Sequence, residues 1–296
     1  NPVTAIYPAL LTTPGTSPEG LPGAESLDIK SSLSLIETMA RKVWQETDRL
    51  RPRFWQRPQE FYHSEAYFKM LVLVTVVQQD FGIRYNPARI APPDKPEPTK
   101  VFFADSQDVF INGALGPRRS GTCSSLPVLY TTIGRQLGYP LKLVIAKAHL
   151  FVRWDDEREK LNIEASGRGL SIFPDEHYRQ WPYPISPEEE KRGRFLRSLT
   201  PSEEMAIFLE SRAMVLIAHE RFTEAREAVK LAGALTPQWS EIKGLFLSYV
   251  DRVEAGPPKP MLLDRGAPRI VGPYAKQMAD LIETQEASTS ARPWCS

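Results

Sequence analysis

The chain has 296 residues and carries 37 Lys and Arg against 36 Asp and Glu, a formal net charge of +1. Its hydrophobic content of 42% and charged content of 25% are typical of a globular protein, with one large domain plus an appendage or with two domains. The charge balance argues against broad binding to nucleic acid or to a membrane surface, which needs a basic face.

The apolar runs argue against a membrane-spanning protein, and the cysteines argue against a disulfide-rich one. The longest largely apolar run, Met70 to Val77, is too short to cross a membrane and suits a buried helix. The two cysteines, Cys123 and Cys295, do not make a disulfide framework. The first residue is Asn rather than Met, so the alternative that a signal peptide or membrane anchor preceded it stays open. No compartment is assigned, with the cytoplasm slightly favoured.

The N-terminal third is expected to be mostly helical. Residues 1–25 are rich in Pro, Gly, Ser and Thr and indicate an extended or disordered leader. Helical spacing of apolar residues predicts a helix from Leu27 to Leu50 that ends near Pro52. A second helix is predicted from Pro58 to Phe81, apolar on nearly all sides and therefore central. The proline-rich stretch from Tyr85 to Lys100 indicates a loop.

The middle of the chain alternates between short elements and one clear helix. Val101 to Phe103 is expected to be a short strand, and Asp105 to Leu115 a turn with a short helix. A helix is predicted to open at Cys123, because apolar residues then recur at steps of three and four up to Leu137. Gly138 is placed to end it.

Three strands are predicted next. They cover residues 141–145, His149 to Trp154, and Leu161 to Ala165, and the last two are joined by the charged turn Asp155 to Lys160. The proline cluster from Pro182 to Pro187 indicates a linker or a domain boundary.

The C-terminal part is predicted to be helical from Thr200 to Glu254, and it begins with a Thr-Pro-Ser-Glu cap. Residues 239–254 are expected to form a capping helix. Five residues fit the small-residue and proline positions of one tetratricopeptide repeat: Ala206, Ala213, Ala225, Ala232 and Pro237. One repeat is too few to stand alone, so it must pack on the core. Pro and Gly return after residue 255, with one weak helix at Pro273 to Glu283.

Three residue types with matching chemistry occur on consecutive predicted elements. Cys123 opens a helix, whose positive dipole end favours the thiolate that a nucleophile requires. His149 enters one strand and Glu164 lies within the next, so the two can lie side by side across an antiparallel ladder. The imidazole could then take and return a proton while the carboxylate holds the ring. This order predicts a nucleophile, a base and an orienting acid.

These residues resemble the transglutaminase-like superfamily of cysteine enzymes. The likeness rests on the turn Gly121-x-Cys123, the Leu-Gly-x-Pro helix exit at Leu137 to Pro140, and His149 before a Phe-Val-Arg strand. It covers roughly residues 60–255. Papain-like enzymes place histidine well over a hundred residues after cysteine, which is not the plan here.

The segment FFADSQDVFINGALGPRRSG at 102–121 is similar to a bacterial subgroup with tetratricopeptide-like helices behind the core. The resemblance implies an α+β fold, in which a cysteine-bearing helix packs on an antiparallel sheet and a small α-helical segment follows. It implies four parts: the leader at 1–25, the core at 26–199, the helical segment at 200–255 and the tail at 256–296. Most of the superfamily has Asp as third member, where this chain has Glu164. Some of the subgroup has lost the cysteine.

The expected activity is attack of Cys123 on an amide or ester carbonyl, giving a thioester that passes to water or to an amine. Protease or amidase and acyl transferase both stay open. The Cys123 N–H is one candidate oxyanion donor, and Gln107 or Asn112 is a candidate for a second. Three arginines are candidates for binding an acidic substrate: Arg118, Arg119 and Arg168. A protein or peptide substrate is expected, with a possible protein partner on the helical segment.

Each site residue also has a plainer interpretation. Cys123 could be a small buried hydrophobe, His149 could satisfy a core hydrogen bond, and Glu164 could point to solvent. The chain would then be an inactive transglutaminase-like module that binds a protein or peptide, or a structural domain that assembles through its tails. Cys123, His149 and His177 lack the paired spacing of a zinc site, so no metal and no cofactor is expected.

Overall fold

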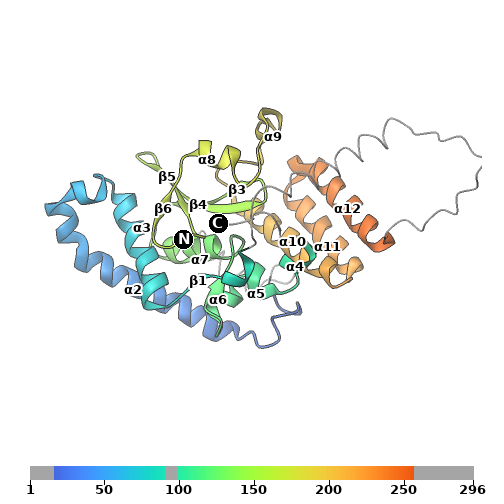
Figure 1. Ribbon diagram of the computed structural model, residues 1–296, viewed down its shortest axis with the longest axis horizontal. Coiled ribbons are helices and arrows are strands. Elements are labelled where there is room, and N and C mark those ends of the chain that lie inside the picture. The colour runs from blue at the N-terminus through green and yellow to red at the C-terminus, as the bar shows by residue number, and fades with distance from the viewer. Residues whose placement is uncertain (1–16, 91–98, 257–296) are drawn as a thin grey trace, which may run out of the picture.

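The computed structural model describes residues 17–90 and 99–256. Most of the predicted leader and nearly all of the predicted tail, with its helix at Pro273 to Glu283, lie outside the described residues. Figure 1 shows a small sheet near the middle of the molecule, with long helices on one side and the C-terminal helices on the other.

Four antiparallel strands form the central sheet in the order β3-β4-β5-β6. They are β3 (Leu141–Ala146), β4 (His149–Asp155), β5 (Lys160–Glu164) and β6 (Ser171–Ile172). The first three match the predicted strands to within one residue at each end. Val152 lies opposite both Leu143 on β3 and Ile163 on β5, and none of these three side chains is exposed. This row of buried side chains forms one face of the sheet.

The helix that follows Cys123 packs across this sheet. It is α7 (Leu126–Gln136), and it contacts β3 and β4 as well as α2 (Ile29–Gln56) and α3 (Glu65–Thr75). Leu129 and Ile133 on α7 are completely buried, because the helix is covered on both sides. The predicted α+β fold, with a helix next to the cysteine on an antiparallel sheet, is confirmed.

The first helix is longer than predicted. α2 continues through Pro52 to Gln56 instead of ending near the proline. Pro52 removes a backbone N–H from the helix, which usually weakens it. The last turn is nevertheless held by packing, because the Phe54 ring stacks on the Phe68 ring of α3 with the centroids 5.0 Å apart. Tertiary contacts therefore outweigh the local signal.

The second predicted helix, Pro58 to Phe81, is broken into pieces. A 3₁₀ turn at Pro58–Phe61 comes first, and α3 begins only at Glu65. Tyr62 and His63 lie between them, and both adopt a left-handed backbone, with φ of 54° and 57°. Ser64 then caps α3 through its side chain. Apolar periodicity shows which face is buried, but it does not reveal such a break.

The strand predicted at Val101 to Phe103 is wrong. Residues Thr99–Phe102 form the short helix α4, and the Phe103 N–H donates to the Thr99 carbonyl at 3.1 Å, the spacing of an α-helix. Three apolar residues are too few to separate strand from helix. The other short elements of this part are a π-helical turn at Val76–Asp80, β1 (Arg84–Tyr85), a 3₁₀ turn at Pro87–Arg89, α5 (Ser106–Val109), α6 (Asn112–Leu115) and β2 (Ser120–Gly121).

Helices dominate the chain after the sheet. They are α8 (Asp175–Gln180), α9 (Pro187–Lys191), α10 (Pro201–Ala218), α11 (Phe222–Leu235), a 3₁₀ turn at Pro237–Trp239 and α12 (Ser240–Ala255). α10 starts with the predicted cap, a capping box between Thr200 and Glu203. The helical segment α10–α12 agrees with the helical pattern, and its tetratricopeptide character stays a prediction.

A buried ion pair joins this helical segment to the core. Two nitrogens of Arg135 on α7 donate to the Glu204 carboxylate of α10 at 2.6 and 2.8 Å, and a third donates to the Leu141 carbonyl of β3 at 2.8 Å. Both charged side chains are almost fully buried. The pair fixes α10 against both the helix and the sheet of the core.

The described end of the leader is packed rather than extended. Leu21 is only 2% exposed. Arg212 donates to the Ser17 carbonyl and Arg221 to the Gly20 carbonyl, each at 2.6 Å. This stretch therefore lies against α10 and its neighbouring turn.

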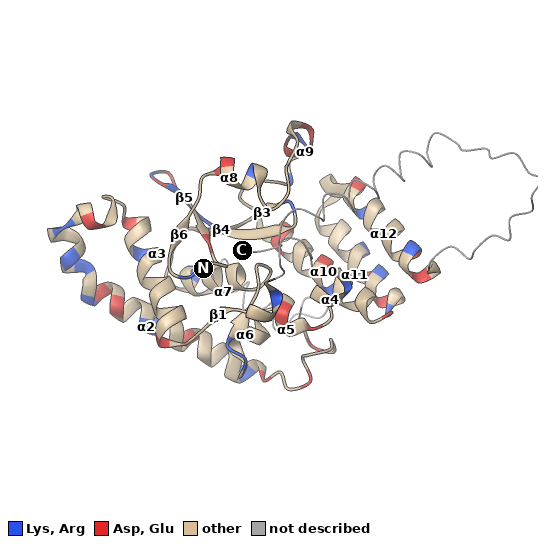
Figure 2. Cartoon of the chain, in the orientation of Figure 1, with Lys and Arg blue, Asp and Glu red and all other residues tan. Residues whose placement is uncertain are grey.

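Charged side chains of both signs are mixed along α2, as Figure 2 shows. Glu46, for example, pairs with Lys42 at 2.8 Å and with Arg49 at 2.7 Å. No helix within residues 17–90 and 99–256 is long and apolar enough to cross a membrane.

Candidate active site

Cys123 lies in a tight turn between β2 and α7, so the helix begins slightly later than predicted, at Leu126. The turn is tied at both ends. The Thr122 N–H donates to Ser125 Oγ at 2.9 Å, and the Thr122 hydroxyl donates to the Asp108 carbonyl at 2.6 Å. These bonds fix the backbone on either side of the cysteine.

Gly121 is required for this turn. A Cβ at position 121 would lie 2.5 Å from Ser125 Oγ and 3.0 Å from Leu126 Cδ2. Any larger residue would push apart the serine that holds the turn and the first residue of α7. The glycine in the motif therefore allows the close approach that sets the position of Cys123.

Asp108 supports the same turn from behind, a role that no sequence pattern indicated. Its side chain is 1% exposed, and it accepts hydrogen bonds from Asn86 Nδ2 at 2.6 Å and Arg89 Nε at 2.8 Å. A buried carboxylate with two such donors holds its segment firmly. Residues from both sides of the undescribed stretch 91–98 thus meet beneath the cysteine turn.

His149 and Glu164 meet across the sheet. His149 is the first residue of β4, and Glu164 is the last residue of β5. Val152 pairs with Ile163, so one step further along the ladder Glu164 lies opposite Phe151. Alternate residues of a strand share a face, so Phe151 and His149 lie on the same face of β4, and Glu164 lies on that face too. His149 Nε2 and Glu164 Oε2 are 2.7 Å apart, and both side chains are buried.

The tautomer of the imidazole follows from this contact. A carboxylate only accepts hydrogen bonds, so Nε2 of His149 carries the proton and donates it to Glu164. In a neutral ring the basic lone pair then belongs to Nδ1. The pair thus orients His149 with Nδ1 as the nitrogen that can take up a proton.

Glu164 is kept charged by its neighbours. Burial by itself raises the pKa of this carboxyl, but the charge of His149 and hydrogen bonds from His149 and Ser166 outweigh it. The pKa of Glu164 therefore lies below its usual value. The Ser166 N–H donates to Glu164 Oε1 at 2.8 Å, so the two carboxylate oxygens have separate donors.

Two aromatic residues of the α8 region complete this pair, and the sequence did not single them out. The Tyr178 hydroxyl donates to Glu164 Oε2 at 3.2 Å, while its ring stacks on Phe151 with the centroids 3.8 Å apart. The edge of one ring meets the face of the other between Trp181 and His149, with the centroids 4.6 Å apart. His177 is partly buried and stacks on Trp181.

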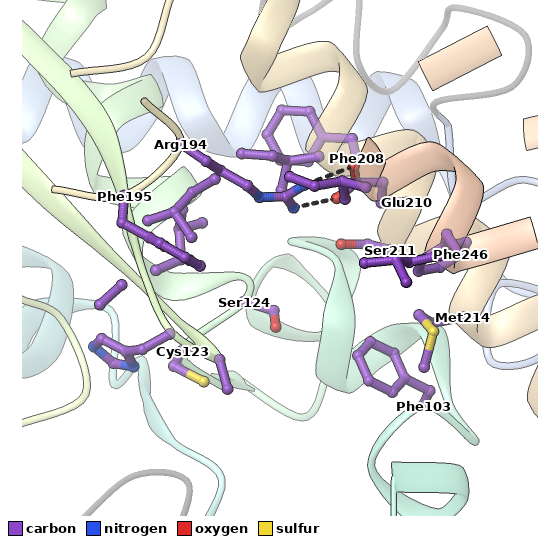
Figure 3. Close-up of a pocket in the computed structure, with 18 of the residues that line it drawn as sticks. Phe103, Cys123, Ser124, Arg194, Phe195, Phe208, Glu210, Ser211, Met214 and Phe246 are labelled. Atoms are coloured by element: carbon purple, nitrogen blue, oxygen red, sulfur yellow. Dashed lines mark hydrogen bonds and ion pairs between the residues drawn. The ribbon is translucent and has the colours of Figure 1, made fainter. Parts of the chain in front are cut away.

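Cys123 and His149 line the same cavity, whose volume is about 440 Å³. Only 3% of Cys123 is exposed, so the thiol is reached through this cavity rather than from the open surface. Figure 3 shows Cys123 and Ser124 on one side of the space and Ser211, Met214 and Phe246 on the other. The second side belongs to α10 and α12.

The two predicted oxyanion side chains lie elsewhere. Gln107 and Asn112 line a different cavity, together with Arg119. The Asn112 amide is engaged with Ser106. The reason is local: α5 and α6 are packed so closely that a Cβ at Gly113 would lie 1.9 Å from the Gln107 carbonyl oxygen.

The predicted arginines are not brought to the thiol either. Arg118 is exposed and pairs with Asp105 at 2.8 Å, and Arg168 is exposed in the bend after β5. None of Arg118, Arg119 and Arg168 lines the cavity of Cys123. Arg192 and Arg194 line it instead. They follow the proline cluster, and no spacing rule connects them with the cysteine motif.

No group of three or more His, Cys, Asp and Glu side chains that could hold a metal ion occurs in the described part of the chain. The neighbouring groups of the site are a thiol, an imidazole and a carboxylate, which suit nucleophilic and acid–base chemistry.

A comparison with known families finds a match in this part of the chain. Residues 98–210 match the family model described as the transglutaminase-like superfamily, and this match spans the cysteine turn, α7 and the whole sheet. No curated protein and no solved structure matches the chain. The match ends within α10, so the rest of the helical segment lies beyond it. Over residues 98–210, the chain is therefore similar to the transglutaminase-like superfamily.

Proposed function

We propose that this protein is a cysteine enzyme that transfers or hydrolyses acyl groups through a thioester on Cys123. His149 acts as its base and acid, and Glu164 orients the histidine. The observation that carries the proposal is that Cys123 and His149 line one cavity while His149 Nε2 lies 2.7 Å from Glu164 Oε2.

In the first half-reaction, Cys123 Sγ attacks the carbonyl carbon of an amide or ester, and the thiol proton passes to His149 Nδ1. The tetrahedral intermediate carries a negative charge on the former carbonyl oxygen, for which the Cys123 backbone N–H is the candidate donor. Collapse breaks the bond to the leaving group, which takes the proton from His149. The products are a thioester and a free amine or alcohol.

In the second half-reaction, His149 takes a proton from water or from an amine as it attacks the thioester. The sulfur leaves and regains a proton, so the enzyme returns to its starting state. Glu164 stays ionised throughout, because the charge of His149 and the hydrogen bonds from His149 and Ser166 lower its pKa. Its negative charge in turn stabilises the imidazolium formed at each step. Water gives a hydrolase and an amine gives a transferase, and both share every group named here.

The low exposure of Cys123 supports a second candidate function, an inactive module that binds a peptide in the same cavity. A buried cysteine often serves as a small core side chain. The two functions differ in one property that can be measured, the reactivity of the thiol with an electrophile.

The test is alkylation of the full chain with iodoacetamide at neutral pH, followed by peptide mass spectrometry. We expect Cys123 to be labelled, and the rate constant to fall roughly a hundredfold in His149→Ala, in line with the contribution of a general base. Circular dichroism of each variant checks that it is folded. An unreactive Cys123 in the folded wild type, or an unchanged rate constant in His149→Ala, would favour the binding module.

A further inference from the structure

The cavity of Cys123 has two walls of different character. The inner wall carries the reacting groups and belongs to the cysteine turn and to β4. The outer wall is contributed largely by the helical segment, with Phe208 and Met214 from α10 and Phe246 from α12. Phe103 and Phe195 also line the cavity. Figure 3 shows several of these apolar side chains around an open space in front of Cys123 and Ser124.

The charged side chains that line this cavity are all paired within the described residues. Arg194 donates to both carboxylate oxygens of Glu210, at 2.5 and 3.2 Å, and about 15% of each side chain is exposed. The remaining pairs are Glu189 with Lys147, Arg192 with Glu241, and His149 with Glu164. Each charge that lines the cavity therefore has an opposite charge nearby, tightly paired for Arg194 and Glu210 and more loosely for the exposed Arg192.

An apolar lining with paired charges favours substrates with apolar side chains over substrates with charged side chains. An apolar side chain placed in the cavity gains roughly 25 cal/mol for each Å² removed from water. A charged side chain would lose its hydration there and find only ions that already have partners. The hydroxyl of Ser211 and that of Ser124 lie toward the middle of the space, where a peptide backbone could bond to them (Figure 3).

We infer that the acyl group taken up by Cys123 bears a bulky uncharged side chain, aromatic or branched aliphatic, and that α10 and α12 form its binding pocket. The substrate class is then a peptide or protein segment with such a residue on the carbonyl side of the bond that reacts. This inference rests on the proposed function, and it assigns the helical segment a role in substrate choice.

The probes are three N-acetylated amino-acid chloromethyl ketones, of Phe, Glu and Lys, with iodoacetamide as a small reference. Each reacts when Sγ displaces chloride, forming a carbon–sulfur bond as the thiol loses its proton. We expect the Phe probe to alkylate Cys123 at least roughly tenfold faster than the Glu and Lys probes, the discrimination typical of an apolar pocket. Equal rates for the three probes would overturn the inference.

Leu245 offers a variant that leaves the fold intact, because it lines the cavity yet 68% of it is exposed. Leu245→Asp adds a negative charge, so it should lower the preference for the Phe probe over the Lys probe several-fold. Leu245→Lys adds a positive charge, so it should lower the preference for the Phe probe over the Glu probe several-fold. The matched control is Leu231→Asp on α11, a residue 53% exposed that is not among those lining the cavity.

An effect of Leu245→Asp no larger than that of Leu231→Asp would overturn the inference. Iodoacetamide separates this failure from a failure of the proposed function. Labelling of Cys123 by iodoacetamide without a preference among the ketones contradicts only the apolar pocket. A Cys123 that iodoacetamide does not label contradicts both proposals.

Discussion

The two walls of the Cys123 cavity are built in different ways. The reacting groups of the inner wall come from a short part of the chain, between Gly121 and Glu164, and are positioned by one tied turn and one strand register. The outer wall comes from α10 and α12, and the ion pair of Glu204 with Arg135 holds α10 against the core. Local geometry positions the groups that react, and long-range packing positions the groups that would select a substrate.

The strongest test of this difference breaks the joint between the walls. In Glu204→Gln, Arg135 would stay buried without its counter-charge. Loss of one partner of a buried pair costs about 3–5 kcal/mol, so the free energy of unfolding in urea should fall by that amount. The control is Glu227→Gln, which removes an exposed ion pair with Lys230 and should change the free energy of unfolding by less than about 1 kcal/mol. Equal effects would show that the walls are not joined at this point.

A second test perturbs the inner wall alone. Gly121→Ala places a Cβ 2.5 Å from Ser125 Oγ, so we expect a loss of about 1–3 kcal/mol in the free energy of unfolding, together with slower alkylation of Cys123. Gly244→Ala on α12 is the matched control. It has open space around its Cβ, and it should stabilise the helix by about 0.5–1 kcal/mol. If Gly121→Ala left the free energy of unfolding unchanged, the turn would not be constrained as described.

The third test uses pH. Because the pKa of Glu164 is lower in the folded chain than in the unfolded chain, its contribution to stability is complete above the usual value of about 4.5. The contribution is lost as the pH falls through the folded pKa. Glu164→Gln should therefore flatten the acid side of a stability–pH curve measured by urea unfolding. The control is Glu157→Gln, in the exposed turn after β4, and its curve is compared with that of Glu164→Gln.

The smallest expected effect concerns Tyr178. Tyr178→Phe keeps the ring that stacks on Phe151 and removes the hydrogen bond to Glu164, so stability should fall by about 0.5–1.5 kcal/mol. Loss of this donor also makes the ionised form of Glu164 less stable relative to the protonated form. Because the ionised carboxylate orients His149, alkylation of Cys123 should slow several-fold. A stability loss with unchanged alkylation would assign Tyr178 to packing only.

The difference between the walls also explains what the sequence could reveal. Strands β3, β4 and β5 and the partnership of His149 with Glu164 follow from alternation and register, which are local properties. The family resemblance covered the same part of the chain, and the family match confirms it. Sequence order was therefore enough to single out Cys123, His149 and Glu164, although not the residues that support them, such as Asp108 and Tyr178.

Other features depended on contacts between distant residues. α2 passes through Pro52 because Phe54 packs on Phe68, and no local rule contains that contact. In the same way Gln107, which is close to Cys123 in sequence, faces another cavity. Arg194, which is far from Cys123 in sequence, lines the cavity of the thiol. Beyond Cys123 and His149, proximity along the chain was a poor guide to which side chains line the cavity.

The central claim is that Cys123 forms an acyl thioester with the help of His149. The most direct measurement is the intact mass of the full chain after incubation with the p-nitrophenyl ester of N-acetylphenylalanine. We predict one acyl adduct on Cys123 that hydroxylamine removes, with no such adduct in Cys123→Ala and far slower formation in His149→Ala. A folded wild type that gains no adduct, or gains it equally in Cys123→Ala, would contradict the account.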